Sequence, residues 1–341
     1  MSMKESKSKY LLTTIIPMYN SAEYVYHTLN VVVQSFGKYR DQIQVILVDD
    51  GSTDETKEIA QEFCTKYSNF QLILQKHKGV SAARNLGIAY AKGDYITFID
   101  SDDEITAQFM KVVKQLEIRE FDIIITNMLK TLTNTNLSKQ DKIAIFQIIN
   151  NKAGGESPWA KFYKRDFLNF NNLLFNTNLI IGEDALFLYK AITLADSISI
   201  NKIEYYKQCD PHTIGKFKSK MLSSELLFIK DLGNLFNTYK NVAEYNEVIS
   251  IENRYKLKEF YRLIENYFIP LYFQKKISIF EINKQLRRIA NLWNIRGALK
   301  QNPYSRLYWH KRQKLWGLLI KINGFDLLIR SAILFKKQNK Y

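Results

Sequence analysis

Short apolar segments alternate with amphipathic segments along the first part of the chain. Each apolar segment has the length of one strand, and each amphipathic segment shows the spacing of a helix with one apolar face. Strands that are apolar throughout and are joined by helices are typical of a parallel sheet covered on both faces. We therefore expect an α/β fold with a mostly parallel central sheet. The expected strands are Leu11–Ile16, Ile43–Val48, Phe70–Leu74 and Tyr95–Ile99, and the expected helices are Ser21–Phe36, Thr53–Tyr67 and Val80–Ala91.

The rest of the chain is predicted to complete this α/β domain, up to residue 215, and then to form a helical region at 216–341. Gly154 and Gly155 interrupt a polar stretch at 131–155, which we expect to be irregular. The other elements expected in the α/β domain are a helix to Glu117, a strand Phe121–Asn127, helices Pro158–Phe167 and Glu183–Ala195, and an antiparallel pair, Ile198–Ile200 with Ile203–Tyr206. The expected C-terminal helices are Ser219–Tyr239, Ala243–Tyr267 and Ser278–Ile289.

Polar residues follow three of the expected strands, at the point where each strand ends. In open α/β sheets, ligands bind outside the carboxyl ends of the strands. Asp100, Asp102 and Asp103 place three acids within four residues, and such acids repel one another. A hard divalent cation relieves that repulsion because it prefers oxygen ligands; a solvated acidic turn is the alternative. The three polar segments are Pro17–Asn20, Asp49–Ser52 and Asp100–Asp103.

The positive charge of the chain lies in its C-terminal part. Residues 1–210 hold 24 Lys and Arg against 25 Asp and Glu, whereas residues 211–341 hold 25 against 9. This asymmetry favours a polyanionic partner, either nucleic acid or an anionic membrane surface. Cys64 and Cys209 are too few for a metal cluster or a disulfide scaffold, which favours a cytoplasmic setting. The segment Met1–Tyr10 has no apolar stretch, so we expect no signal peptide.

Two common nucleotide-binding motifs do not occur in the sequence. Neither G-x-G-x-x-G after the first strand nor G-x-x-x-x-G-K-[ST] is present, so a dinucleotide oxidoreductase and a P-loop phosphotransferase are not expected. A nucleotide bound through Asp50 and a metal is the remaining pattern. Ser52 and Glu55 fit a helix capping box, which explains that pair without a ligand. Arg84 can meet a phosphate or brace an aspartate.

Four segments together are similar to the motifs of family 2 glycosyltransferases. They occur in the order and at the intervals of that family and cover residues 11 to about 105. The resemblance implies the GT-A fold, with the catalytic domain at 1–215. It also implies transfer of a sugar from a nucleotide-sugar with inversion of the anomeric centre. The four segments are Thr14–Asn20, Val48–Asp54, Gly79–Asn85 and Phe98–Asp103.

The resemblance also assigns roles at the donor site. Asp50 would bind the uracil of a UDP-sugar, and Arg84 would lie near the base and the diphosphate. Asp102 is the expected ligand of Mg²⁺ or Mn²⁺, with Asp100 as its supporting partner. His212 could complete the metal shell or close over the diphosphate, and a solvated loop histidine is the alternative. The residues implied at the donor are Pro17, Tyr19, Glu23, Asp50, Arg84, Asp100 and Ser101.

The same family requires a catalytic base, which the resemblance places on the pair Glu183 and Asp184, with Asp184 as the base. Acids that merely favour the first turn of a helix are the alternative. The upstream segment Ser157–Lys164 resembles the Trp-x-Lys-Leu-Tyr-Lys segment of bacterial polysaccharide glycosyltransferases. By that resemblance Trp159 could form an apolar platform for the acceptor sugar, with Lys161 beside it.

The tail Tyr304–Tyr341 places basic residues beside Trp, Leu and Phe. Charges at Lys321, Asp326 and Arg330 interrupt its apolar stretch, so it should not span a bilayer. It fits instead an interfacial helix on anionic lipid; packing on the catalytic domain or on a second copy is the alternative. No recognised nucleic-acid-binding module accompanies the charge, so nucleic acid is not expected as a partner.

These observations predict a metal-dependent, inverting glycosyltransferase at the inner face of a bacterial membrane. It would move a sugar from a UDP-sugar to a hydroxyl of a glycan or a polyprenyl-linked acceptor, in the synthesis of surface polysaccharide or glycoconjugate. Two alternatives stay open. A sugar nucleotidyltransferase would share the strand-end acids and the metal, and a membrane-associated scaffold would keep the fold without catalysis. A homo-oligomer is compatible with the predicted glycosyltransferase.

Overall fold

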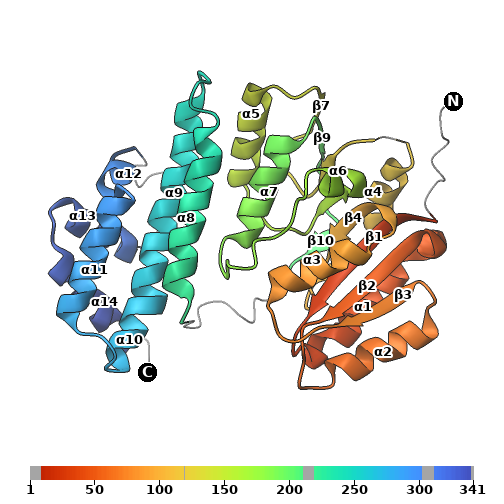
Figure 1. Cartoon of the computed structure of the whole chain (residues 1–341), viewed down its shortest axis with the longest axis horizontal. Helices are drawn as coiled ribbons and strands as arrows, with labels where there is room; N and C mark the ends of the chain where they lie inside the picture. Colours follow the sequence, from red (N-terminus) through yellow and green to blue (C-terminus); the bar gives the residue numbers. More distant parts are fainter. Residues whose placement is uncertain (1–8, 119, 210–218, 302–310, 339–341) are drawn as a thin grey trace. The chain divides into compact units, whose positions relative to one another are not determined.

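The computed structural model describes residues 9–118, 120–209, 219–301 and 311–338. The chain divides into two compact units, which are described separately (Figure 1). Unit 1 contains residues 1–178 and 182–211, and unit 2 contains residues 179–181 and 212–341. The division after residue 211 lies close to the boundary expected at 215, and the roles expected for the two segments stay predictions.

An eight-stranded sheet forms the centre of unit 1, and most of its neighbouring strands are parallel. β1 pairs in parallel with β2 and β4, and β2 with β3. β8 lies antiparallel between β4 and β6, and β7 lies antiparallel to β9. The expected α/β fold with a mostly parallel sheet is therefore confirmed. In sheet order the strands are β3 (Phe70–Leu74), β2 (Ile43–Asp49), β1 (Tyr10–Met18), β4 (Gly93–Phe98), β8 (Lys161–Lys164), β6 (Ile123–Ile125), β9 (Ser197–Ile200) and β7 (Leu132–Thr135).

Helices pack on both faces of this sheet because alternate side chains of each buried strand point to opposite faces. Leu12 and Ile16 of β1 belong to one apolar core with residues of α1, α2 and α4. Ile15 points to the other face, where α3 packs against β1 and β2. A second sheet pairs β5 (Glu104–Ile105) with β10 (Tyr206–Lys207). The helices of unit 1 are α1 (Ala22–Phe36), α2 (Thr56–Lys66), α3 (Val80–Tyr90), α4 (Phe109–Leu116), α5 (Lys139–Asn150), α6 (Arg165–Phe170) and α7 (Glu183–Leu194).

Three predicted elements of unit 1 are wrong. The segment 131–155, expected to be irregular, contains β7 and α5, and a capping box between Ser138 and Asp141 begins α5. The expected helix Pro158–Phe167 contains β8, because this segment fills the gap between β4 and β6. The expected pair Ile198–Ile200 with Ile203–Tyr206 does not form, since β9 pairs with β6 and β7 while β10 pairs with β5.

Unit 2 is helical, as the C-terminal pattern predicts. A π-helix, Ile264–Phe268, links α9 to α10. α8 packs on α9, and the acids Glu225 and Glu259 are buried beside Arg262. Within the described ranges, no helix has both the length and the apolar character that crossing a bilayer requires. The helices are α8 (Met221–Asn237), α9 (Tyr245–Leu263), α10 (Ile269–Phe273), α11 (Ile279–Leu292), α12 (Ile295–Gln301), α13 (Lys311–Lys321) and α14 (Phe325–Gln338).

The substitution Gly87→Ala should lower the free energy of unfolding by about 1–3 kcal/mol, the usual cost of overpacking. A Cβ at this position of α3 would lie 2.4 Å from Cγ2 of Ile15, a stiff β-branched side chain in β1. Urea denaturation measures the effect. Thr65→Ala, on the exposed side of α2, is the control and should change stability by less than about 0.5 kcal/mol. Equal effects of the two substitutions would contradict the close packing of α3 on β1.

Candidate functional site

A buried arginine joins two acidic segments at the carboxyl edge of the sheet. Arg84, near the start of α3, donates to Asp184 Oδ1 at 2.7 Å and to Asp100 Oδ1 at 3.1 Å. Its guanidinium lies 5.3 Å from the ring centre of Phe175. Asp100 follows β4, and Asp184 lies in the first turn of α7. One cation therefore holds together residues that are 84 positions apart in the sequence.

The surroundings of Asp184 bring the pKa of its carboxyl group close to neutral pH. Burial raises the pKa of Asp184 to about 7, and the negative charges of Glu183 and Asp100 also raise it. The positive charges of Arg84 and Lys161 act in the opposite direction and lower this pKa. A carboxyl group with these properties is suited to accept a proton near neutral pH.

Tyr206 organises the acidic loop that follows β4. Its hydroxyl donates to Asp103 Oδ2 at 2.7 Å and accepts from the backbone N–H of Asp100 at 3.0 Å. The backbone N–H of Cys209 donates to the other carboxylate oxygen of Asp103. Burial raises the pKa of Asp103 to about 6. Asp103 is therefore occupied in holding the loop, whereas Asp100 is held by Arg84.

The remaining acids of this loop fit the chemistry of a hard divalent cation. Asp100 and Asp102 offer carboxylate oxygens in one turn after β4, and two protein carboxylates leave positions for water and phosphate oxygens, as Mg²⁺ prefers. In the part of the chain that the structure describes, no group of three or more His, Cys, Asp or Glu side chains is arranged to hold a metal. His212, expected in the metal shell, lies outside the described residues.

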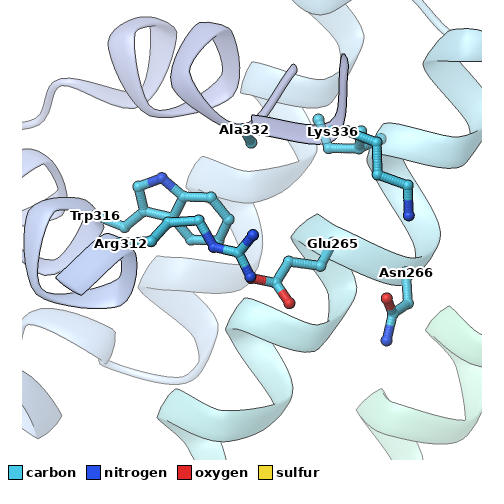
Figure 2. A pocket seen from close by; sticks show the side chains of 7 residues that line it. Glu265, Asn266, Arg312, Trp316, Ala332 and Lys336 are labelled. Atoms are coloured by element: carbon cyan, nitrogen blue, oxygen red, sulfur yellow. The ribbon is translucent and has the colours of Figure 1, made fainter. Parts of the chain in front are cut away.

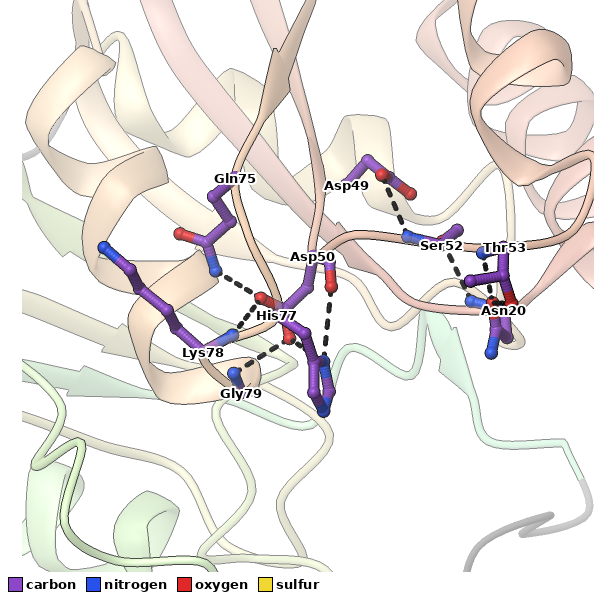
Figure 3. A network of polar contacts seen from close by, with 9 residues as sticks. All are labelled: Asn20, Asp49, Asp50, Ser52, Thr53, Gln75, His77, Lys78 and Gly79. Carbon is purple, nitrogen blue, oxygen red and sulfur yellow. Dashed lines mark hydrogen bonds and ion pairs between the residues drawn. The ribbon is translucent and has the colours of Figure 1, made fainter.

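The carboxylate of Asp50 is fully engaged by the segment that follows β3 (Figure 3). Oδ1 accepts from Gln75 Nε2 at 2.6 Å and from the backbone N–H of Lys78 at 2.8 Å. Oδ2 accepts from the backbone N–H of Gly79 at 2.8 Å and lies 2.9 Å from His77 Nδ1. These four contacts fill the acceptor positions of a carboxylate. Asp50 thus fixes the loop 75–79 at the sheet edge, and its contact with uracil stays a prediction.

His77 of this loop and Tyr19 of the segment after β1 have exposed rings. The rings of Tyr19 and His77 stack with their centres 4.1 Å apart, and each side chain is about half exposed. Stacked, accessible rings of this kind can pack on the face of a planar base. Pro17 pairs with Val48 in the sheet, and Glu23 lies exposed in the first turn of α1.

The capping box expected for Ser52 and Glu55 does not form. α2 begins at Thr56, and its N-terminus has no side-chain cap from Glu55. Ser52 instead accepts a hydrogen bond from the backbone N–H of Asn20 at 2.9 Å, and Asn20 accepts one from the backbone N–H of Thr53 at 2.8 Å (Figure 3). The loops after β1 and β2 are therefore tied to each other.

The two residues expected at the acceptor are both buried. Trp159 stacks on Tyr206 with ring centres 4.6 Å apart and planes 6° apart. Lys161 is 1% exposed, its ammonium donates to the carbonyl of Trp159, and burial lowers its pKa to about 7. Both side chains are packed below the surface in this conformation, and their contact with an acceptor stays a prediction.

Sequence reasoning missed three residues of this site: Gln75, His77 and Tyr206. His77 could have been found, because it follows the third expected strand in the way that Asp50 and Asp100 follow the second and fourth. Tyr206 carries no comparable signal, since its partner Asp103 lies 103 positions away.

The comparisons with known proteins agree with this geometry. The model of the family described as "Glycosyl transferase family 2" matches residues 13–192, which is more than half of the chain. The chain belongs to this family. The range includes Asp50, Arg84, Asp100 and Asp184, so the resemblance that the four motifs carry is confirmed.

Several bacterial glycosyltransferases are similar to this family member along most of its length. Glycosyltransferase GlyG of Streptococcus pneumoniae is 27% identical over 284 residues, which cover 71% of this chain and 92% of GlyG. The cholesterol galactosyltransferase of Borreliella burgdorferi is 24% identical over 347 residues, covering 95% of this chain and 86% of that protein. The crystal structure of Staphylococcus aureus TarS 1–349 with UDP-GlcNAc superposes with a TM-score of 0.61 at 20% identity, covering 97% of this chain and 92% of that one. The structural likeness confirms the GT-A fold.

The substitution Tyr206→Phe should lower the free energy of unfolding by about 1–3 kcal/mol, because it leaves the buried Asp103 carboxylate without its hydroxyl donor. Sugar transfer should fall as well, since the loop that carries Asp100 and Asp102 loses its support. Thermal unfolding and initial rates measure the two effects. Tyr163→Phe is the stability control, because that buried hydroxyl has no hydrogen-bond partner among the described residues. Wild-type stability and rate in Tyr206→Phe would remove this positioning role.

Proposed function

We propose that this glycosyltransferase moves a sugar from a UDP-sugar to a hydroxyl of a glycan or a polyprenyl-linked acceptor, with inversion of the anomeric centre. The observation that carries the proposal is the double ion pair of Arg84 with Asp100 and Asp184. An in-line displacement needs a base and a leaving-group site on opposite sides of one sugar carbon. The pairing of Arg84 supports that arrangement, because it keeps the acidic loop close to the proposed base.

Asp184 is the proposed catalytic base. It would take the proton of the acceptor hydroxyl as that oxygen attacks the anomeric carbon, and no glycosyl-enzyme intermediate is needed. A base is most effective when its pKa lies near the working pH, and burial brings the pKa of Asp184 to about 7. The negative charge of Glu183, its neighbour in the first turn of α7, raises that pKa.

Asp102, supported by Asp100, is the proposed holder of a Mg²⁺ or Mn²⁺ ion. Such an ion supplies Lewis-acid stabilisation of the charge that grows on the departing diphosphate. Ser101 accepts a hydrogen bond from Thr28 at its backbone carbonyl, at 3.0 Å, and this contact steadies the turn between the two acids. His212 stays a proposed partner of the diphosphate or the metal.

The proposed donor pocket lies between the loops after β1, β2 and β3. Tyr19 and His77 would stack on the uracil, while Asp50 holds the loop 75–79 in place. Pro17 and Glu23 would border the nucleotide. UDP-GlcNAc is the first donor to test, because the similar TarS structure contains it.

Of the two proposed acceptors, a glycan and a polyprenyl-linked acceptor, we favour the lipid-linked one. Similarity over 95% of this chain to a protein named as a cholesterol galactosyltransferase supports an acceptor with a lipid part. With such an acceptor, the enzyme would act at the inner face of the bacterial membrane, in the synthesis of a surface polysaccharide or glycoconjugate. Trp159 and Lys161 would support the acceptor side of the pocket from beneath.

The substitution Asp184→Asn should lower the transfer rate by about 10²–10⁴-fold, the usual contribution of a general base. The assay is UDP release from a panel of UDP-sugars with Mg²⁺ or Mn²⁺, with EDTA as the test of the metal. Glu183→Gln is the matched control in the same helical turn and should keep a larger share of the rate. Release of pyrophosphate in place of UDP would indicate a nucleotidyltransferase. If the wild-type protein turns over none of the donors, the alternative of a membrane-associated scaffold without catalysis is favoured.

The pH dependence of kcat/KM should show one acidic limb, with activity lost as the pH falls through about 7, because only the deprotonated form of Asp184 accepts a proton. Arg84→Met should move this limb to higher pH, since Arg84 lowers the pKa. Glu183→Gln should move it to lower pH, since Glu183 raises the pKa. The measurement is kcat/KM of the wild type and the two variants over a range from about pH 5 to about pH 9. Shifts of both variants in one direction would contradict Asp184 as the titrating group.

A further inference from the structure

The last two helices of unit 2 form a hairpin with a firmly packed inner face. α13 and α14 contact each other, and α14 also contacts α10 and α11. Trp316 is buried, and its indole N–H donates to Ser331 at 2.9 Å. Arg312 pairs with Glu265 of the π-helix and lies over the Trp316 ring, and these residues border a cavity of about 230 Å³ (Figure 2). The side of the hairpin that faces the other helices is thus defined.

The turn between the two helices is also fixed. Arg287 of α11 donates to the side chain of Asn323 at 2.6 Å, and its guanidinium lies 5.0 Å from the ring centre of Phe325. Asn283 of α11 donates to Asp326 at 2.6 Å. Because α11 holds the turn in this way, the hairpin presents one constant outer face.

That outer face carries large apolar side chains in helical register. One stripe follows α13 and a second follows α14, each with the spacing of residues on one side of a helix. Their exposed fractions run from 42% to 73%. Exposed apolar groups that recur at this spacing indicate a surface that contacts an apolar partner. The stripes consist of Leu315 and Leu318 on α13 with Ile322 directly after it, and of Leu327 and Leu334 on α14.

Basic residues accompany both stripes. Lys314 and Lys321 are exposed beside the α13 stripe, and Arg330 lies exposed between Leu327 and Leu334. Residues 311–338 contain seven Lys and Arg and one acid, Asp326. Long basic side chains can lay their apolar stems on a hydrocarbon surface and reach anionic groups with their charged ends. Apolar groups flanked by cations match the boundary between headgroups and acyl chains in an anionic membrane.

We propose that the outer face of the α13–α14 hairpin is a membrane-docking surface that lies on anionic phospholipid. A second copy of the chain fits the same face less well, because a two-fold interface brings one patch against itself. The seven basic residues of the hairpin would then face one another, with only one acid of each hairpin, Asp326, to offset their charge. The proposed lipid-linked acceptor gives this surface its purpose, whereas the binding itself is independent of sugar transfer.

The test is co-sedimentation of the full chain with vesicles of phosphatidylcholine, with and without phosphatidylglycerol. Wild-type protein should bind the mixed vesicles more tightly than the neutral ones, and added salt should weaken this binding. Two triple variants should each bind the mixed vesicles more weakly than the wild type, by about tenfold or more. One is Leu315→Ser with Leu318→Ser and Ile322→Ser, and the other is Lys314→Glu with Lys321→Glu and Arg330→Glu.

Control variants place the same kinds of change, two in each variant, on exposed residues of unit 1. Ile118→Ser with Phe170→Ser removes two apolar side chains that are 80% and 87% exposed, and Lys111→Glu with Lys114→Glu reverses two exposed charges of α4. Both controls should bind like the wild type, and circular dichroism should show that all variants are folded. Wild-type vesicle binding in either hairpin variant overturns the proposal. A hairpin variant that loses self-association but keeps vesicle binding also overturns it, in favour of an interface between copies.

Transfer to a water-soluble acceptor separates this surface from the proposed function. Both hairpin variants should keep that activity, since none of the residues they change is among those proposed for catalysis or donor binding. A wild-type protein that binds vesicles and transfers no sugar would refute the proposed function and leave the docking surface intact.

Discussion

The double ion pair of Arg84 is the interaction on which the site depends. A guanidinium withdrawn from water costs several kcal/mol unless charged partners replace the lost solvent. Asp100 and Asp184 supply those partners from the loop after β4 and from the first turn of α7. Three segments distant in sequence must therefore meet at one point. Close packing of α3 on β1 at Gly87 brings Arg84 to that point, which links the sheet core to the chemistry.

The same ion pair sets a balance at Asp184. Burial alone would raise the pKa of this carboxyl far above its ordinary value, and an exposed pair with arginine would lower it. The two influences oppose each other here, together with the negative charges of Glu183 and Asp100, and the resulting pKa is about 7. A group that is ionised near neutral pH and still basic is what general-base chemistry requires.

The local sequence pattern predicted those elements whose structure depends on neighbouring residues in the chain. The first four strands are apolar parallel strands between amphipathic helices, so their apolar runs and strand-end acids could be predicted from the sequence. β8 could not, because Lys161–Lys164 becomes a strand only through its neighbours β4 and β6. The site divides in the same way. Asp50, Arg84, Asp100 and Asp184 lie in local motifs, whereas the stacking of His77 on Tyr19 and the bond of Tyr206 to Asp103 join residues far apart in sequence. The helical periodicity of unit 2 predicts that its charged residues face the solvent. Glu225 and Glu259 are exceptions, because both are buried.

The charge of Arg84 has a further consequence for how a donor diphosphate could be held. Its two carboxylate partners already offset its positive charge, so Arg84 adds little attraction for another anion. Residues 1–210 have nearly equal numbers of acids and bases, which provides no strong overall field for a nucleotide-sugar. A diphosphate placed beside Asp100 and Asp102 would add negative charge to an acidic loop. Such a loop can accept it only with an additional cation, and this electrostatic requirement supports the proposed divalent ion at Asp102 independently of any likeness to other proteins.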